Sequence, residues 1–166
     1  TGVRVAGQLR PSAFTTPEAP ELQSLLANMR DADVACVALE ASSHALVQRR
    51  AWGIACDACV FTNLTQDHLD YHGTMNAYLD AKLMMFDGRN RDRLRRPCRA
   101  VVNVDDPSWA RVVDAARRGG CDVTTYGEAP HADLRITALA PAPDGLAFTL
   151  VADGEAHAIR LPLLGR

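Results

Sequence analysis

Apolar residues in the first part of the chain recur with the spacing of a helix and then form a continuous run. Over residues 16–33 they follow the i, i+3, i+4, i+7 pattern of a helix with one buried face, at Leu22, Leu25, Leu26 and Met29. We expect this helix to begin at Thr16, with Pro17 in its first turn. The next stretch, "VACVALE", is apolar up to Glu40, which is typical of a central parallel strand whose carboxyl end opens into a site.

The alternation of strands and helices continues to residue 120. Strands are predicted over 57–63 and 99–104, and helices over 43–52, 75–86 and 105–120. The last helix is expected to have Asp106 as its N-cap, Pro107 at its first position and Gly119 beyond its end. Repeated strand–helix units predict a parallel sheet with right-handed crossovers.

From Cys121 onward the pattern changes to an alternation of apolar and polar residues. Three strands are predicted, over 133–140, 146–152 and 155–163, with turns at "PAPDG" and "ADGE". The predicted fold class is α/β, a mostly parallel sheet flanked by helices, with a small antiparallel β extension at the C-terminal end. Residues 1–120 form the α/β part and residues 121–166 the β-rich part of this expectation.

Composition narrows the functional classes. With 166 residues, 48% of them hydrophobic, the chain fits one globular domain. A net charge of -2 and a pI near 6.2 argue against a dedicated nucleic-acid binder. One basic run is interpreted as a solvated loop, because no aromatic residues interleave with it: Arg89, Arg91, Arg93, Arg95, Arg96 and Arg99. Neither an apolar run of about 18 residues nor a secretory leader is found, so we expect a cytoplasmic protein without membrane insertion.

The five cysteines lack the regular spacing of a disulfide scaffold, and we expect reduced, mostly buried thiols. Cys56 and Cys59 have the spacing of a redox or zinc pair. Because they fall in a predicted strand, an offset of three would put their sulfurs on opposite faces. A second pair that would complete a zinc site is missing from the sequence.

Polar residues gather where the predicted strands end. Glu40 follows one strand and the segment from Asn63 to His68 follows the next, so both could face one crevice and bind Mg²⁺ or Mn²⁺. His72 is four residues beyond His68, but Gly73 and Thr74 follow it, which favours a loop and a supporting role for His72. Lys82, taken alone, would be an exposed helix lysine whose ammonium a metal would repel. It becomes an anionic ligand only as a carbamate formed with CO₂.

Four separated segments together carry a resemblance to a known family: "TTPEAPELQ", "LEASSHALVQRR", "FTNLTQDHLDYHGTMNAYLDAK" and "VVNVDDP". In order and spacing they resemble the Mur ligases, and most closely the UDP-N-acetylmuramoyl-tripeptide synthetases, which add the third amino acid of the peptidoglycan stem peptide. The resemblance is dense over residues 15–107. It implies an ATP-dependent ligase that activates a peptide carboxylate as an acyl phosphate, which the incoming amine then attacks.

The resemblance also implies roles for individual residues. Glu40 matches an acidic Mg²⁺ ligand, His68 a histidine at a second metal position, and Lys82 the carbamoylated lysine near that metal. His68 and Lys82 are the implied catalytic residues, and Asn63 and Asp67 would support them. Five residues match positions that hold UDP-MurNAc-dipeptide: Thr15, Thr16, Ser42, Gln48 and Arg50. The other substrates would be ATP and either meso-diaminopimelate or L-lysine.

One family feature is missing from this sequence, the phosphate-binding loop G-x-x-G-K-[ST]. We expect it just before Thr1, and a further domain after Arg166, so that the chain is part of a central ATP-binding domain and inactive alone. The alternative is a non-catalytic module that binds a nucleotide-sugar peptide. A metal-dependent hydrolase using Glu40, His68 and His72 is a third hypothesis. A serine hydrolase is disfavoured, because the Ser42–His44 segment lacks G-x-S-x-G.

Overall fold

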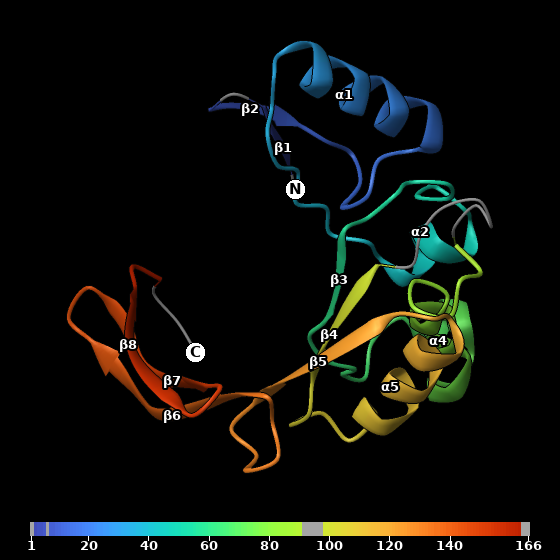
Figure 1. The fold of residues 1–166 in the computed structure, drawn as a ribbon. Helices are drawn as coiled ribbons and strands as arrows, with labels where there is room; N and C mark the ends of the chain where they lie inside the picture. The colour runs from blue at the N-terminus through green and yellow to red at the C-terminus, as the bar shows by residue number, and fades with distance from the viewer. Residues whose placement is uncertain (1, 6, 91–97, 164–166) are drawn as a thin grey trace. The chain divides into compact units, whose positions relative to one another are not determined.

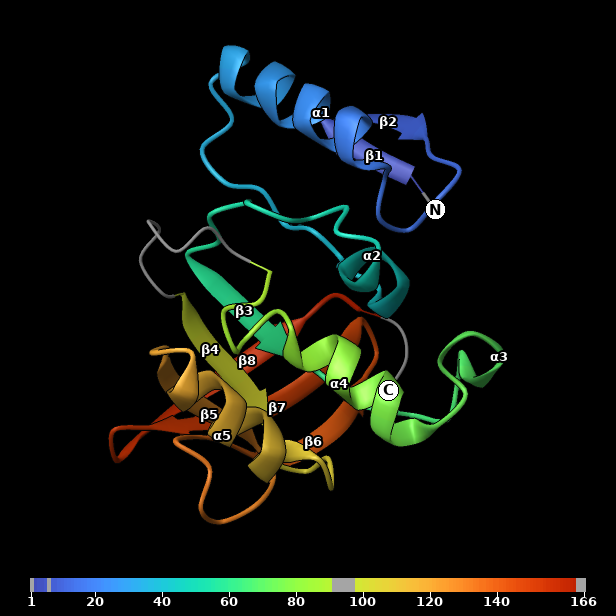
Figure 2. The same cartoon turned by 90° about the vertical axis from the view of Figure 1, so that its right-hand side faces the viewer.

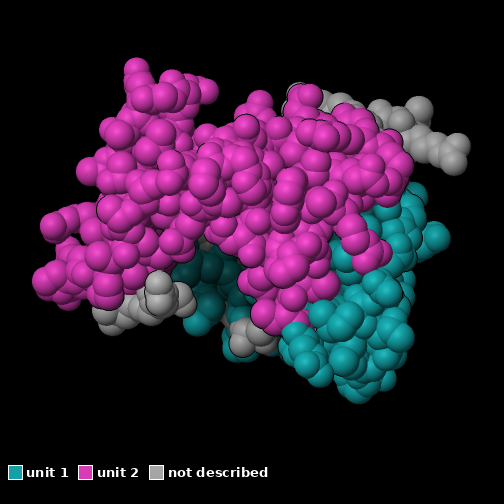
Figure 3. All heavy atoms as spheres, turned by 90° about the horizontal axis from the view of Figure 1, so that it is seen from below, with its two compact units in different colours: residues 1–55, 66–96 teal, residues 56–65, 97–166 magenta. Residues whose placement is uncertain are grey.

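The structure is a computed structural model that describes residues 2–5, 7–90 and 98–163. The chain divides into two compact units (Figure 3). Unit 1 comprises residues 1–55 and 66–96, and unit 2 comprises residues 56–65 and 97–166. Each unit is described separately below.

Unit 1 is mainly helical. Its elements are an antiparallel hairpin of β1 (Gly2–Val5) and β2 (Gln8–Pro11) and the helices α1 (Ala19–Asp31), α2 (Ser43–Val47), α3 (Leu69–His72) and α4 (Met75–Leu83). Helix α4 contacts both α2 and α3 (Figure 2). Its buried residues are Tyr78, Leu79, Ala81 and Leu83. Among the helices that the structure describes, none is long and apolar enough to cross a membrane.

Unit 2 contains one six-stranded sheet and one helix (Figure 1). The strands follow chain order: β3 (Ala58–Phe61), β4 (Arg99–Asn103), β5 (Asp122–Gly127), β6 (Leu134–Ala142), β7 (Gly145–Ala152) and β8 (Glu155–Leu161). Neighbouring strands are parallel from β3 to β6 and antiparallel from β6 to β8. Helix α5 (Trp109–Arg118) packs against β4 and β5. The predicted fold class, with its antiparallel extension, is confirmed.

Two predicted helix starts are wrong by a few residues, because side chains expected to cap helices have other partners. Helix α1 begins at Ala19, since the Thr16 hydroxyl bonds to residues 40 and 42 instead. Helix α5 begins at Trp109. The Asp106 carboxylate accepts hydrogen bonds from the backbone N–H of Ser108 at 2.7 Å and of Leu64 at 2.6 Å, and therefore joins the loop after β3 to the loop after β4.

The predicted strand over residues 34–40 is absent from the structure as a strand. Strand assignment requires a hydrogen-bonded neighbour, and within the described ranges no segment forms a ladder with this one. The segment has no regular secondary structure, and Val37 is 44% exposed despite its apolar side chain. Helix α2 is also shorter than predicted, since the chain adopts a left-handed conformation at Arg49 (φ 57°) soon after Val47.

The turns of the extension are confirmed. Asp153 and Gly154 join β7 to β8 with φ angles of 51° and 82°, the left-handed pair that an Asp-Gly hairpin turn needs. Three elements were not predicted: the β1–β2 hairpin, strand β5 and the short helix α3. The loop expected around His72 is wrong, because Leu69–His72 form this helix, which ends at Gly73. The β-branched and aromatic sequence "VTTY" between Gly120 and Gly127 was the available indication of β5.

Of the basic run, only Arg89 and Arg99 lie within the described residues; the other four arginines fall outside them.

Candidate functional site

The predicted site residues, except Asn63, belong to unit 1, where Thr16 connects two of its loops. Thr16 is 1% exposed, and its hydroxyl donates to the Glu40 carbonyl at 2.8 Å. The same oxygen accepts from the Ser42 backbone N–H at 3.0 Å. The loop that carries Thr16 and the exposed Thr15 is therefore held against the segment that carries Glu40 and Ser42.

Ser42 begins helix α2. Its hydroxyl accepts a hydrogen bond from the Ala45 N–H at 3.2 Å and so caps the helix. Gln48 lies at the other end of this helix, and its side chain is exposed. The short helix thus separates these two predicted substrate contacts by about one and a half turns.

Arg50 is held by three neighbours from the loop before α1. One terminal nitrogen donates to the Thr16 carbonyl at 3.0 Å, and the other pairs with the Glu18 carboxylate at 2.9 Å. The guanidinium lies 4.6 Å from the centre of the Phe14 ring, a cation–π distance. The Arg50 side chain is only 11% exposed, and its buried Nε has no hydrogen-bond partner among the described residues. One donor of a pre-positioned guanidinium is thus left unsatisfied.

Five rings from α2, α3, α4 and the loop before α3 form a cluster: His44, His68, Tyr71, His72 and Tyr78. The ring centre of His44 lies 4.1 Å from that of Tyr71 and 4.8 Å from that of His68. His72 and Tyr78 are stacked, with ring centres 5.2 Å apart and planes 20° from parallel. The cluster brings His68 and His72 to the same side of α4 as Tyr78.

His72 supports this cluster through a buried serine. Its Nε2 lies 2.9 Å from the hydroxyl of Ser43, which is 2% exposed. Burial lowers the pKa of His72, and the neighbouring His44 and His68 lower it further. A neutral ring with a hydrogen-bonded partner suits the supporting role predicted for it. The helix predicted over residues 75–86 also begins at Met75, with the Thr74 hydroxyl accepting from the Ala77 N–H.

His68 has a left-handed backbone (φ 54°, ψ 24°) at the start of α3. Asp67 holds it there, since its carboxylate accepts from the His68 backbone N–H at 2.7 Å and lies 3.5 Å from Nε2 of the ring. A non-glycine residue in this conformation costs free energy that neighbouring contacts must offset. Asp67 therefore supports the position of His68, as expected. Asn63, which follows β3, lies in unit 2 and is exposed.

Lys82 lies in the last turn of α4, four residues after Tyr78. Its Nζ is 5.2 Å from the centre of the Tyr78 ring, and the His68 ring centre is 5.8 Å from the same ring. Tyr78 is thus a common neighbour of the two predicted catalytic residues. Burial raises the pKa of Tyr78, and the charge of Asp67 raises it further, so the phenol stays neutral.

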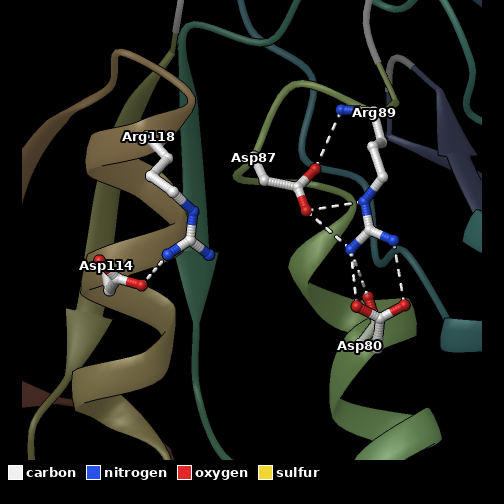
Figure 4. A network of polar contacts seen from close by, with 5 residues as sticks. All are labelled: Asp80, Asp87, Arg89, Asp114 and Arg118. Carbon is white, nitrogen blue, oxygen red and sulfur yellow. Dashed lines mark hydrogen bonds and ion pairs between the residues drawn. The ribbon is translucent and has the colours of Figure 1, made fainter.

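The end of α4 is fixed by a charged network (Figure 4). Arg89 pairs with Asp80 at 2.9 Å and with Asp87 at 2.7 Å. These hydrogen bonds raise the pKa of the Arg89 guanidinium. Because Asp80 is two residues before Lys82, the network holds the turn from which the lysine projects.

Glu40 is the predicted ligand that the structure leaves apart. Its carbonyl accepts from Thr16, but within the described residues its carboxylate forms no hydrogen bond or ion pair, including with His68 or Lys82. In the same described part, no group of three or more His, Cys, Asp or Glu residues could hold a metal ion. The predicted ligands Glu40 and His68 are only two residues of these types, because the third ligand is a modified lysine. The metal site therefore stays a prediction.

Some contacts of the site were not predicted. Phe14 and Glu18 fix Arg50, and Tyr78 links His68 with Lys82. Of these contacts, only the one between Tyr78 and Lys82 had an indication in the sequence. The two residues are four positions apart on a predicted helix and so lie on one face.

Comparisons with known proteins show which family this chain resembles. The whole chain, residues 1–166, matches the Mur ligase middle domain. It is 40% identical over 158 residues to a UDP-N-acetylmuramoyl-L-alanyl-D-glutamate--2,6-diaminopimelate ligase of Caulobacter vibrioides, covering 95% of this chain and 32% of that protein. It is 41% identical over 167 residues to the ligase of the same name from Geobacillus thermodenitrificans, covering 99% of this chain and 33% of that protein.

A solved structure of such a diaminopimelate ligase superposes with a TM-score of 0.79 at 32% identity, covering 95% of this chain and 32% of that one. The chain therefore spans about a third of the length of the relatives it matches. Because the family match extends over every residue, the chain belongs to the Mur ligase family, as its middle domain.

Proposed function

We propose that this chain is the middle domain of an ATP-dependent amide ligase that adds diaminopimelate to UDP-MurNAc-L-Ala-D-Glu in the cytoplasm, during peptidoglycan synthesis. The observation that carries the proposal is the identity of about 40% to diaminopimelate ligases over nearly the whole chain. Diaminopimelate is favoured over L-lysine because these relatives bear its name. Full activity would require the whole ligase, of which the chain is a third of the length.

The loop around Thr16 and helix α2 would bind the UDP-MurNAc-dipeptide. Thr15 and Gln48 expose their side chains, and Ser42 lies between them at the start of the helix. Arg50 supplies a positive charge held by Phe14 and Glu18, and its unsatisfied Nε can donate to an anionic oxygen of the substrate. A preformed cation loses little side-chain entropy on binding.

Lys82 is the residue for which the sequence itself gives further support. Of the 18 Lys and Arg residues of the chain, Lys82 is the only lysine. A guanidinium stays protonated at neutral pH, whereas a lysine can lose its proton. The neutral amine of Lys82 would attack CO₂, forming an N–C bond and releasing a proton, and the product is an anionic carbamate. Arginine cannot replace lysine in this step.

The carbamate on Lys82, together with Glu40 and His68, would then offer an oxygen-rich set of donors suited to Mg²⁺. Bound Mg²⁺ would offset negative charge on the phosphoryl oxygens of ATP and of the acyl phosphate. In this proposal Asp67 and His72 orient the histidine cluster, and Tyr78 contacts both the His68 ring and the ammonium end of Lys82.

The test uses the protein expressed from its complete reading frame, with ATP, UDP-MurNAc-L-Ala-D-Glu and diaminopimelate. Formation of UDP-MurNAc-tripeptide is followed by mass spectrometry. We expect Lys82→Ala to lose about 100-fold or more in rate, since even the loss of a residue that only supports a metal ligand costs about 10- to 100-fold. A small carboxylate such as acetate should restore part of the activity by filling the vacated space.

Lys82→Arg is the matched control, because it keeps the positive charge and the length but cannot form a carbamate. We expect it to be as inactive as Lys82→Ala and not to respond to acetate. An active Lys82→Arg enzyme would refute the carbamate. A wild-type protein that binds UDP-MurNAc-L-Ala-D-Glu but turns over no ATP would instead support the non-catalytic binding module.

A further inference from the structure

Four of the five cysteines gather at one end of the sheet in unit 2. Cys98 directly precedes β4 and Cys121 directly precedes β5, and the residues that follow them, Arg99 and Asp122, are register partners in the parallel ladder. The Arg99 N–H also donates to the Asp57 carbonyl, which continues the ladder to the residue before β3. The amino ends of three strands therefore lie side by side.

The sulfurs at this end are in contact. Cys98 Sγ lies 3.7 Å from Cys121 Sγ. The Cys59 thiol hydrogen-bonds to Cys56 and to Cys98. The expectation that Cys56 and Cys59 face opposite sides is wrong, because β3 begins only at Ala58 and Cys56 precedes it. All of these residues are thiols in the structure.

We propose that Cys98 and Cys121 form a dithiol that low-molecular-weight disulfides such as oxidised glutathione convert to an internal disulfide. Neighbouring strands are about 4.8 Å apart, and disulfides join Cα atoms about 4.4–6.8 Å apart. Residues at matching positions of adjacent strands therefore meet the backbone requirement. The two sulfurs have to approach from 3.7 Å to about 2.0 Å, which side-chain rotation can supply.

The steps balance as thiol–disulfide exchange. Cys98, which is half-buried and the more accessible of the two, loses its proton, and its thiolate attacks one sulfur of oxidised glutathione. A mixed disulfide forms and one glutathione thiolate leaves. Cys121, after losing its proton, attacks Cys98 Sγ and releases the second glutathione. Two protein thiols are oxidised, one glutathione disulfide is reduced, and the two glutathione thiolates take up the two protons.

The neighbouring Cys59 is a poor competitor for the same bond. Its pKa is raised strongly, because hydrogen bonding with Cys56 and Cys98, together with burial, favours the protonated thiol. A thiol that stays protonated is a weak nucleophile. Cys121, which is in direct sulfur contact with Cys98, is therefore the partner that completes the exchange.

The test treats the protein, expressed from its complete reading frame, with oxidised glutathione and then digests it without reduction for mass spectrometry. We expect the loss of two protein thiols per chain from this site and a crosslinked peptide pair that carries Cys98 and Cys121. The temperature of unfolding should rise on oxidation, since the bond closes the loop that contains α5, and should fall back with dithiothreitol.

Cys36→Ser is the matched control, because Cys36 is an exposed cysteine in unit 1; this variant should form the same crosslink. Cys121→Ala and Cys98→Ser should each abolish both the crosslink and the rise in unfolding temperature. Because there are two variants, the test still stands if one of them misfolds. A crosslink of Cys56 with Cys59, or of Cys59 with Cys98, in the wild type would overturn the assignment. So would mixed disulfides alone, without an internal bond.

Discussion

Unit 1 and unit 2 are held together in different ways. In unit 2, strands β3 to β8 form a continuous ladder of backbone hydrogen bonds, and a helix with one buried face packs on β4 and β5. In unit 1, the candidate site depends on single side chains that bond to distant backbone or to other rings: Thr16, Arg50, His72 and Arg89. One unit follows a repeating pattern, and the other depends on individual contacts.

This difference indicates which single substitutions should destabilise each unit most. A ladder distributes its stability over many equivalent bonds, so packing of its apolar residues should dominate the effect of single substitutions. A loop held by one hydroxyl can lose its position with that hydroxyl. Three substitutions with matched controls test this distinction.

The largest effect is expected in unit 2, at Phe61. This side chain is 3% exposed at the end of β3, and Phe61→Ala removes a buried ring and leaves a cavity. We expect a loss of about 3–5 kcal/mol in the free energy of unfolding, measured with urea. Its neighbour Val60 is 59% exposed, so Val60→Ala is the control and should change little. Equal losses for both variants would contradict the alternating burial of this strand.

For Thr16→Val in unit 1 we expect a smaller loss of stability than for Phe61→Ala, but a larger effect on substrate binding. The substitution keeps the shape but leaves the Glu40 carbonyl and the Ser42 N–H without this partner. We expect about 1–3 kcal/mol of destabilisation in the same urea titration. UDP-MurNAc-dipeptide binding by calorimetry should also weaken.

Thr15→Val serves as the control for stability, since Thr15 is exposed and next in the chain. If it destabilises the protein as much as Thr16→Val, the tie between the two loops does not carry the effect.

The smallest effect compares two arginines (Figure 4). Arg89 bonds to both Asp80 and Asp87, whereas Arg118 pairs with Asp114 one turn earlier on α5. Exposed ion pairs contribute little, so we expect Arg89→Ala to cost less than about 1 kcal/mol and Arg118→Ala about 0.3–0.5 kcal/mol. Thermal unfolding at low and high salt measures both values. A larger loss at Arg118 would show that the network adds nothing to single pairs.

The sequence predicted the repeating parts of the fold well, for physical reasons. The alternation in residues 133–163 and the Asp-Gly turn are local, and the structure has strands and turn where they were expected. The helices predicted near residues 16–33, 75–86 and 105–120 also exist, although the first and the last begin later because Thr16 and Asp106 bond elsewhere. The apolar run before Glu40 predicts a strand that does not form, because a hydrophobic pattern does not show whether a neighbouring strand is present.

Motifs in the sequence suggested the residues of the candidate site but not their arrangement. Order and spacing of the motifs suggested Glu40, His68 and Lys82, and the structure places two of them around Tyr78 while leaving Glu40 apart. Contacts such as Phe14 with Arg50 join residues far apart in the chain. Contacts of this kind leave no periodic trace in a sequence.

The mixed directions of the sheet also determine the order in which it can form. Strands β6, β7 and β8 follow one another through two-residue turns, so each pairs with its neighbour in the chain. Strand β4 meets β3 only after the whole of residues 62–98 has been brought into a closed loop. Local contacts form faster than distant ones, because less chain entropy is lost before the first bond is made. We therefore expect the antiparallel strands β6, β7 and β8 to fold first. The parallel strands would then pair with them, through the two residue pairs that join β5 to β6.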